Sequence, residues 1–154
     1  MFLSTNDSMK VLDSCFANQV EATYCIEIGD FHFFKDFVIA EFNQGCYVSF
    51  KDLYDIHDLG SLFYQDGHFG FISNRVNSYS IDLIDFHKNR NKLKLIDFYA
   101  IVTYSHFSKK MLPMEDYYFR IDRHSFNYLD NAIHWIFKKI HQDGNSTSNK
   151  FHRS

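Results

Sequence analysis

The sequence predicts an α/β domain with one mixed β-sheet, in which antiparallel strands come first, parallel strands lie at the centre and about four helices pack alongside. Three observations predict this class. Apolar and polar residues alternate over residues 20–28 and again at Phe31 and Phe33, which is typical of antiparallel strands with one buried face. The near-continuous apolar run Leu95–Val102 is typical of a central parallel strand. Segments with helical spacing and capping residues separate and follow these strands.

The bulk composition is that of one globular domain without an affinity for nucleic acid. The chain has 154 residues, enough for a single domain with a substantial core. It contains 18 Phe and 10 Tyr, and rings of this kind are mostly buried in cores. The net charge is −3 and no long basic run occurs, whereas nucleic-acid binding requires clustered Lys and Arg.

The cysteines and the N-terminus favour a cytoplasmic protein. Cys15, Cys25 and Cys46 are widely spaced and form no Cys-x-x-Cys pair, which fits a reducing compartment. The N-terminus turns polar within a few residues and lacks the basic and apolar regions of a signal peptide. No apolar run is long enough to span a bilayer, so no membrane span is expected.

The domain organisation follows from these patterns. Residues 1–18 show no clear period and are expected to form a loosely ordered arm. Residues 19–141 form the α/β domain. Residues 142–154 are polar and are expected to be disordered, because they have nothing apolar to bury.

The first strand is expected at residues 20–28, with a turn at Gly29-Asp30. The alternation resumes at Phe31 and Phe33, a second tight turn is expected at Lys35-Asp36, and a further strand at residues 37–42 ends at residues 43–45. Glu41 lies in it among apolar residues, and the alternation places its side chain in solvent. The alternative is a buried carboxyl group with a raised pKa.

The first helix is expected to begin after Ser49, whose hydroxyl can cap a free N–H group while Asp52 lies in the first turn. Gly60 interrupts its apolar face and is expected to bend the helix or end it early. A short apolar strand follows at residues 69–72. A second helix is expected from Ser80, as its N-cap, with Asp82 in the first turn.

The second half of the chain is expected to alternate strands and helices. The central strand Leu95–Thr103 should lie beside residues 69–73. An irregular third helix is expected near residues 105–115, interrupted at Pro113, followed by an edge strand at Tyr117–Ile121. The last helix should open at Asn127, and its apolar stripe is Leu129, Ile133, Ile136, Phe137 and Ile140.

The candidate site is the polar block that follows the strand at residues 69–72. A helix N-terminus there would present free N–H groups to an anion, and Arg75 adds a planar donor fork suited to carboxylate or phosphate. The competing interpretation is that these Asn and Ser side chains only cap the helix and the turn. The residues proposed to bind a ligand or act as a switch are Ser73, Asn74, Arg75, Asn77, Ser78 and Ser80.

Arg75 itself has two possible arrangements. It can pair with Asp82 or Asp85 of the following helix, which is a structural role. It can also stay partly exposed beside that helix and bind an external anion. The sequence leaves both open.

No catalytic, metal or cofactor site is predicted. The nine histidines show none of the spacings that place two ligands on one helix face. Cys46 precedes a helix, where the dipole can lower a thiol pKa, but no base partner is identifiable. The sequence contains no nucleophile elbow, P-loop or glycine-rich dinucleotide turn.

Several segments resemble those of small bacterial STAS-like proteins; STAS is the domain shared by sulfate transporters and anti-sigma-factor antagonists. The resemblance covers roughly residues 20–140. It is carried by Phe-Gly-Phe-Ile-Ser-Asn-Arg-Val-Asn-Ser-Tyr-Ser at residues 69–80, Val-Ile-Ala-Glu-Phe-Asn-Gln-Gly at 38–45, Tyr-Ala-Ile-Val at 99–102 and Leu-Asp-Asn-Ala-Ile-His-Trp at 129–135. A related form of this fold is the lipid-binding CRAL-TRIO domain.

The resemblance implies a non-enzymatic regulatory or protein-interaction module with a protein partner that the sequence does not identify. In such modules a serine at the start of a helix is phosphorylated, and Ser78 or Ser80 would take that position. The usual Asp-Ser-Ser-Gly is absent, and Asn-Arg-Val-Asn-Ser stands there at residues 74–78. The alternative function, suggested by the many Phe and Tyr residues, is a carrier of a small anionic or lipid-like ligand in an aromatic-lined pocket.

Overall fold

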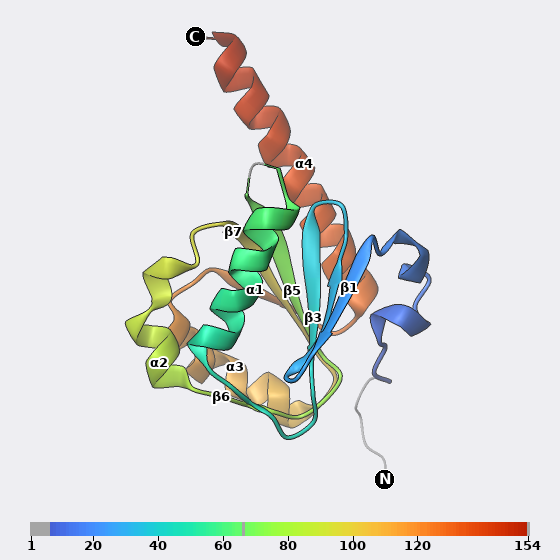
Figure 1. Cartoon of the computed structure of the whole chain (residues 1–154), viewed down its shortest axis with the longest axis vertical. Coiled ribbons are helices and arrows are strands. Elements are labelled where there is room, and N and C mark those ends of the chain that lie inside the picture. Colours follow the sequence, from blue (N-terminus) through green and yellow to red (C-terminus); the bar gives the residue numbers. More distant parts are fainter. Residues whose placement is uncertain (1–6, 66, 154) are drawn as a thin grey trace.

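The computed structural model describes residues 7–65 and 67–153, with side chains through residue 142. In this part of the chain, six strands form one sheet in the order β1-β2-β3-β5-β7-β8 (Figure 1). The first three strands pair in antiparallel fashion, and β3, β5, β7 and β8 are parallel. The predicted α/β class with a mixed sheet is therefore confirmed.

The strands of this sheet are short at its edges and longest at its centre. The central β5 and β7 have all or most of their residues buried, as expected for parallel strands that are covered on both faces. The bounds of the strands are β1 (Ala22–Ile26), β2 (Gly29–Phe33), β3 (Phe37–Phe42), β5 (Phe69–Arg75), β7 (Ile96–Thr103) and β8 (Arg123–Phe126); a separate parallel pair is formed by β4 (Tyr47–Val48) and β6 (Ser80–Ile81).

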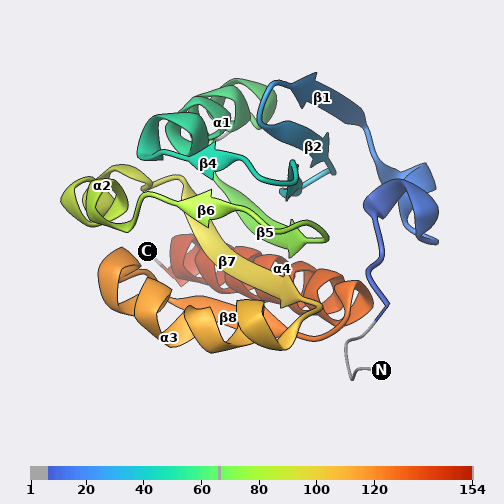
Figure 2. The ribbon, with the colours of Figure 1, turned by 90° about the horizontal axis from the view of Figure 1, so that it is seen from below.

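Helices cover both faces of the sheet. The helices α1 (Phe50–Phe63), α2 (Leu83–Lys88) and α3 (His106–Phe119) lie on one face. The long helix α4 (Leu129–Arg153) covers the other face, together with the N-terminal arm (Figure 2). Short 3₁₀ turns complete the chain at Val11–Asp13, Ala17–Gln19 and Arg90–Lys92.

The N-terminal arm is docked on the sheet. Residues 1–6 lie outside the described residues, but Val11 is fully buried and Phe16 is 9% exposed in the core beneath α4. The arm predicted to be loosely ordered over residues 1–18 is therefore held in place from about Val11 onward. Two apolar side chains and the hydrogen bonds described below hold it there.

The last helix extends into the segment predicted to be a disordered tail. The backbone of α4 continues to Arg153 and projects beyond the domain (Figure 1). Side chains from residue 143 on lie outside the described ones.

Local chemistry explains α1. Ser49 accepts a hydrogen bond from the Asp52 N–H, and Asp52 accepts one from the Ser49 N–H, so the predicted cap is a capping box. Gly60 does not end the helix, which continues to Phe63. A Cβ atom at Gly60 would lie 2.5 Å from the Phe69 ring, so glycine is required there for the helix to approach β5.

Two predictions about α3 and its surroundings are wrong. Pro113 does not interrupt the helix, which runs without a break from His106 to Phe119. The residues predicted as an edge strand, Tyr117–Ile121, mostly belong to the end of this helix, and the edge strand β8 begins at Arg123. Arg120 ends the helix in the left-handed conformation, with φ of 52°.

Ala100 tests the placement of the central strand. It is fully buried in β7, opposite Ile72 of β5, and Ala100→Asp would place an unpaired charge there. We expect a loss of stability on the order of 3–5 kcal/mol or more, enough to abolish the cooperative thermal transition. Circular dichroism melting of the purified variant measures this. The control Asn91→Asp, at an exposed position before the strand, should melt like the wild type.

Candidate functional site

The candidate site is at the carboxyl end of β5, where the strand becomes polar while it is still buried. All seven residues of β5 are buried, including Ser73, Asn74 and Arg75. Successive side chains of a strand point to opposite faces. Ser73 and Arg75 therefore point toward α1, α2 and α3, and Asn74 points toward the N-terminal arm. Each must find a polar partner inside the protein.

Arg75 finds its partner in Glu115, on the buried side of α3. Its Nη1 donates to Oε2 of Glu115 at 2.9 Å, and its Nη2 donates to Oε1 at 2.5 Å. The two side chains are 6% and 8% exposed. This is a buried bidentate ion pair, the strongest arrangement between a guanidinium and a carboxylate.

A second arginine shares the same carboxylate. Arg123 of β8 donates from Nη2 to Oε1 of Glu115 at 3.2 Å and from Nε to Asp116 at 2.8 Å. Its guanidinium carbon lies 4.3 Å from the centre of the Phe119 ring, a cation–π contact. We call Arg75, Glu115 and Arg123 the arginine cluster. Two buried guanidinium groups thus face one buried carboxylate, because Asp116 is 46% exposed.

Burial and neighbouring charges have opposite effects on the pKa of Arg75. Burial alone would lower the pKa of the guanidinium, but the electrostatic effect of Tyr79 and the bonds to Glu115 raise it on balance. The pKa of Tyr99, which contacts Arg123 through its ring, rises to about 12, chiefly because the phenol is buried. Both groups therefore keep their ordinary charge states at neutral pH.

A cavity of about 260 Å³ opens beside the arginine cluster. Arg75 and Glu115 both line it. Its lining residues come from the end of β5, from β6 and the segment before it, and from α2 and α3. Its polar walls include Asn77, Ser78, Ser80 and Ser108, and its apolar walls include Ile81, Leu83, Phe107 and Met111. A pocket with an apolar wall and a few converging polar groups is the usual form of a small-molecule site.

The structure separates the six predicted site residues into three groups. Arg75, Asn77, Ser78 and Ser80 line the cavity. Ser73 lies beneath it, and its hydroxyl is 3.0 Å from the hydroxyl of Tyr79. Asn74 points to the opposite face of the sheet and takes no part in the cavity.

Two local predictions about this site are wrong. Ser80 does not cap a helix, because it lies in β6 and pairs with Tyr47; the N-cap of α2 is Asp82, whose side chain accepts from the Asp85 N–H. Arg75 pairs with neither Asp82 nor Asp85. Asp85 instead accepts from the Phe50 N–H at the start of α1. Both carboxylates are used by nearby backbone N–H groups, and Glu115 reaches Arg75 from α3.

On the opposite face of β5, Asn74 belongs to a second buried polar group. Its Nδ2 donates to Oε2 of Glu41 at 2.7 Å, and its Oδ1 accepts from the Tyr104 hydroxyl at 2.7 Å. His32 lies 3.2 Å from Oε1 of Glu41 through Nε2. We call these four residues the glutamate cluster: His32, Glu41, Asn74 and Tyr104.

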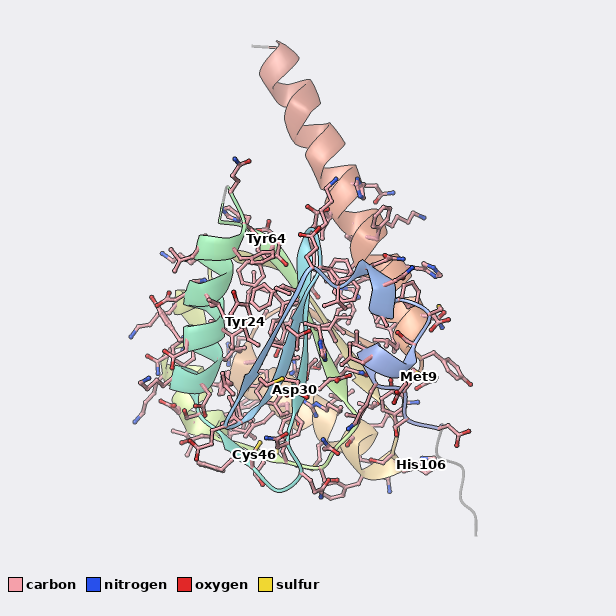
Figure 3. All side chains as sticks on the ribbon, turned by 45° about the vertical axis from the view of Figure 1, so that its right-hand side comes forward. Met9, Tyr24, Asp30, Cys46, Tyr64 and His106 are labelled. Carbon is pink, nitrogen blue, oxygen red and sulfur yellow. The ribbon has the colours of Figure 1, made fainter. Side chains whose placement is uncertain are left out.

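The glutamate cluster holds the N-terminal arm. The Val11 N–H donates to Oε2 of Glu41 at 2.9 Å, and the Met9 carbonyl accepts from Asn74 at 2.8 Å. Met9 lies on the arm to the side of the sheet (Figure 3). The arm thus satisfies groups that would otherwise be buried without partners, which explains why it is docked.

The alternation predicted that Glu41 is exposed to solvent, and this is wrong. The alternative, a raised pKa of its carboxyl group, is wrong too. Glu41 is 6% exposed. Burial pushes the pKa upward, but hydrogen bonds from His32, the Val11 N–H and Asn74 outweigh burial and lower it below 4.5. The alternation failed here because the arm, which is distant in sequence, covers this face of β3.

The remaining candidates are not strengthened by the structure. Burial raises the pKa of the Cys46 thiol, which opposes the activation that a helix dipole would give. Cys46 lies at the lower edge of the domain in Figure 3. Among the residues that the structure describes, no three His, Cys, Asp or Glu side chains gather as a metal site.

The partner of Arg75 is the main residue that sequence reasoning missed. Glu115 lies forty positions after Arg75, in a helix predicted to break at Pro113. One sequence pattern could have indicated Glu115. Phe107, Met111 and Glu115 follow one another at intervals of four, so an unbroken helix places them on one face, and all three line the cavity. Arg123 and Tyr104 carried no such signal.

No family model, curated protein or solved structure matches this chain. The site therefore rests on its own geometry. No helix in the described part of the chain has both the length and the apolar character needed to cross a bilayer.

Arg75→Ala tests the buried pair. Removing Arg75 leaves the Glu115 carboxylate with Arg123 alone, and loss of one partner of a buried pair typically costs about 3–5 kcal/mol. We expect a large decrease in the free energy of unfolding, measured by urea denaturation. Lys110→Ala, at an exposed position on α3, the helix that carries Glu115, is the control and should change the free energy of unfolding by less than about 0.5 kcal/mol. Similar stability of both variants would show that the pair contributes little.

The lowered pKa of Glu41 predicts how the stability of the protein depends on pH. Because its pKa is lowered in the folded state, ionised Glu41 stabilises the protein fully above pH 4.5, and this contribution is lost as the pH falls through the folded-state value. Glu41→Gln should be less stable than wild type at pH 7 by about 1–3 kcal/mol, with the gap narrowing below pH 4.5. Urea denaturation at several pH values measures the gap. The exposed control Glu27→Gln should show almost no gap at any pH.

Proposed function

We propose that this protein is a non-enzymatic binding module whose ligand is a small, partly apolar molecule with an acidic group, held in the cavity beside Arg75. The observation that carries the proposal is the position of the cavity. It lies at the carboxyl end of the parallel strands, where α/β folds commonly bind ligands. Four of the six residues predicted from sequence line it.

The chemistry of the walls supports this class of ligand. Apolar surface is provided by Ile81, Leu83 and Met111. The Phe107 ring, which also lines the cavity, is 73% exposed and so presents a large apolar area to solvent. Arg75 provides the donor fork at the base. The volume is below the range of about 300–1,000 Å³ that holds drug-sized molecules, so the ligand is small.

The non-enzymatic part of the proposal rests on how the polar side chains are used. Glu115 is engaged by two arginines, and the serines at the cavity have no histidine or carboxylate placed to activate them in the contacts described. The STAS-like resemblance supports the same class of function, because modules of that kind act by binding. We place this module in the cytoplasm.

A second candidate function is a protein-interaction module switched at Ser78 or Ser80. Both serines are exposed, and the segment that carries them is tied to the loop after β3: the Gly45 N–H donates to the Ser78 carbonyl and the Ser78 N–H to the Gln44 side chain. A phosphate on either serine would therefore lie at the cavity rim. In a pull-down with the intact chain, Ser78→Asp or Ser80→Asp should release a partner that the wild type retains; retention by both variants would count against a switch.

Blocking the cavity tests the main proposal. Ser108→Trp should fill the space with an indole ring, whereas Lys109→Trp, at the next position and exposed, adds the same ring outside it. We expect wild type and Lys109→Trp to bind hexanoate in an NMR titration, with chemical-shift changes at the cavity residues. Ser108→Trp should lose these changes. Equal binding by all three proteins, or binding by none, would contradict a ligand site here.

A further inference from the structure

The carboxylate of Glu115 already occupies the position where an acidic ligand would bind. Its two oxygens accept from Nη1 and Nη2 of Arg75, the parallel pairing that a carboxylate ligand makes with a guanidinium fork. Both residues line the cavity, so the pair is at the wall that a ligand meets. A ligand carboxylate can therefore reach this fork only by exchanging with Glu115.

We propose that Glu115 is an internal competitor, and that the ligand is a small organic carboxylate which displaces Glu115 from Arg75. This rests on the proposed function, because it assumes that the cavity is a ligand site. It adds the chemical class of the acid and the means by which binding is controlled. The affinity of the site for its ligand is set by how much more strongly the Arg75 guanidinium binds the ligand carboxylate than it binds the Glu115 carboxylate.

Glu115 has a second partner to retain after the exchange. Arg123 donates from Nη2 to Oε1 of Glu115 at 3.2 Å, and its side chain is 1% exposed. Glu115 therefore stays paired with Arg123 when the ligand takes Arg75. The exchange also improves the charge balance of the arginine cluster, since two buried guanidinium groups then face two buried carboxylates.

One feature of α3 favours a local shift near Glu115. The turns at residues 106–111 contain no buried residue, and the buried residues of the helix are Leu112, Glu115 and Phe119. Pro113 has no N–H group and cannot donate to the Lys109 carbonyl, which removes one hydrogen bond just before Glu115. Helices bend most readily at such a position.

Charge favours a carboxylate over a phosphate. The fork itself can pair with two oxygens of either group, and in this structure it holds a carboxylate. A phosphate monoester carries more negative charge at neutral pH and would meet the displaced Glu115 carboxylate at close range, where like charges repel. A carboxylate with a short apolar chain also suits the wall of Ile81, Leu83 and Met111.

The test removes the competitor's charge. In Glu115→Gln the amide keeps the size of the side chain but neither competes as an anion nor repels the ligand. We expect the dissociation constant for hexanoate, measured by NMR titration of the full chain, to fall by about tenfold or more relative to wild type. The dissociation constant for neutral hexanamide should not change, and hexyl phosphate should bind more weakly than hexanoate.

Three outcomes would overturn the inference. Unchanged or weaker hexanoate binding by Glu115→Gln would show that Glu115 is not a competitor, even though the cavity binds ligands. Tighter binding of hexyl phosphate would overturn the carboxylate class. Binding of no probe by either protein would remove the ligand site altogether, and the proposed function with it.

A measurement on the wild type covers the case in which Glu115→Gln does not fold. With ¹³C-labelled protein, hexanoate should shift the carboxyl resonance of Glu115, because one of its guanidinium partners is lost. Hexanamide leaves the pair intact and should not shift it. Equal shifts with both probes, or none with hexanoate at saturation, would contradict displacement.

Discussion

The burial of β5 on both faces is the constraint on which the site depends. A strand at the centre of a covered sheet is normally apolar to its end, yet β5 finishes with Ser73, Asn74 and Arg75 while it is still buried. Because strand side chains alternate, the polar groups emerge on opposite faces. Each face must then supply buried partners, since an unpaired polar group inside a protein is costly.

These partners connect β5 to distant parts of the chain. Glu115 and Arg123 join α3 and β8 to one face of the strand, and Glu41, with Asn74, joins the N-terminal arm to the other. The same interactions that satisfy β5 thus determine where α3 and the arm lie. The cavity lies beside these interactions, because α3 is buried at Leu112, Glu115 and Phe119 while its earlier residues Phe107, Ser108 and Met111 line the cavity.

The proposed ligand exchange uses this arrangement directly. A buried ion pair contributes little net stability compared with apolar packing, which agrees with the proposed role of this pair in ligand exchange. Here the pair lines a cavity and one partner has an alternative arginine, which are the two conditions for an exchange. The glutamate cluster has no comparable freedom: its carboxylate is held by three donors and covered by the arm.

The sequence by itself determined the fold class, the central strand near Leu95–Thr103, the capped start of α1 and the polar block at residues 73–80, since each depends on neighbours within a few positions. The tertiary structure decided which residues those polar side chains meet. It placed Glu115 rather than Asp82 or Asp85 on Arg75, covered Glu41 with the arm, and moved Ser80 from a helix cap into β6. The physical reason is that periodicity and capping report local geometry, whereas the partner of a buried charge is set by elements that pack together from far apart in the chain.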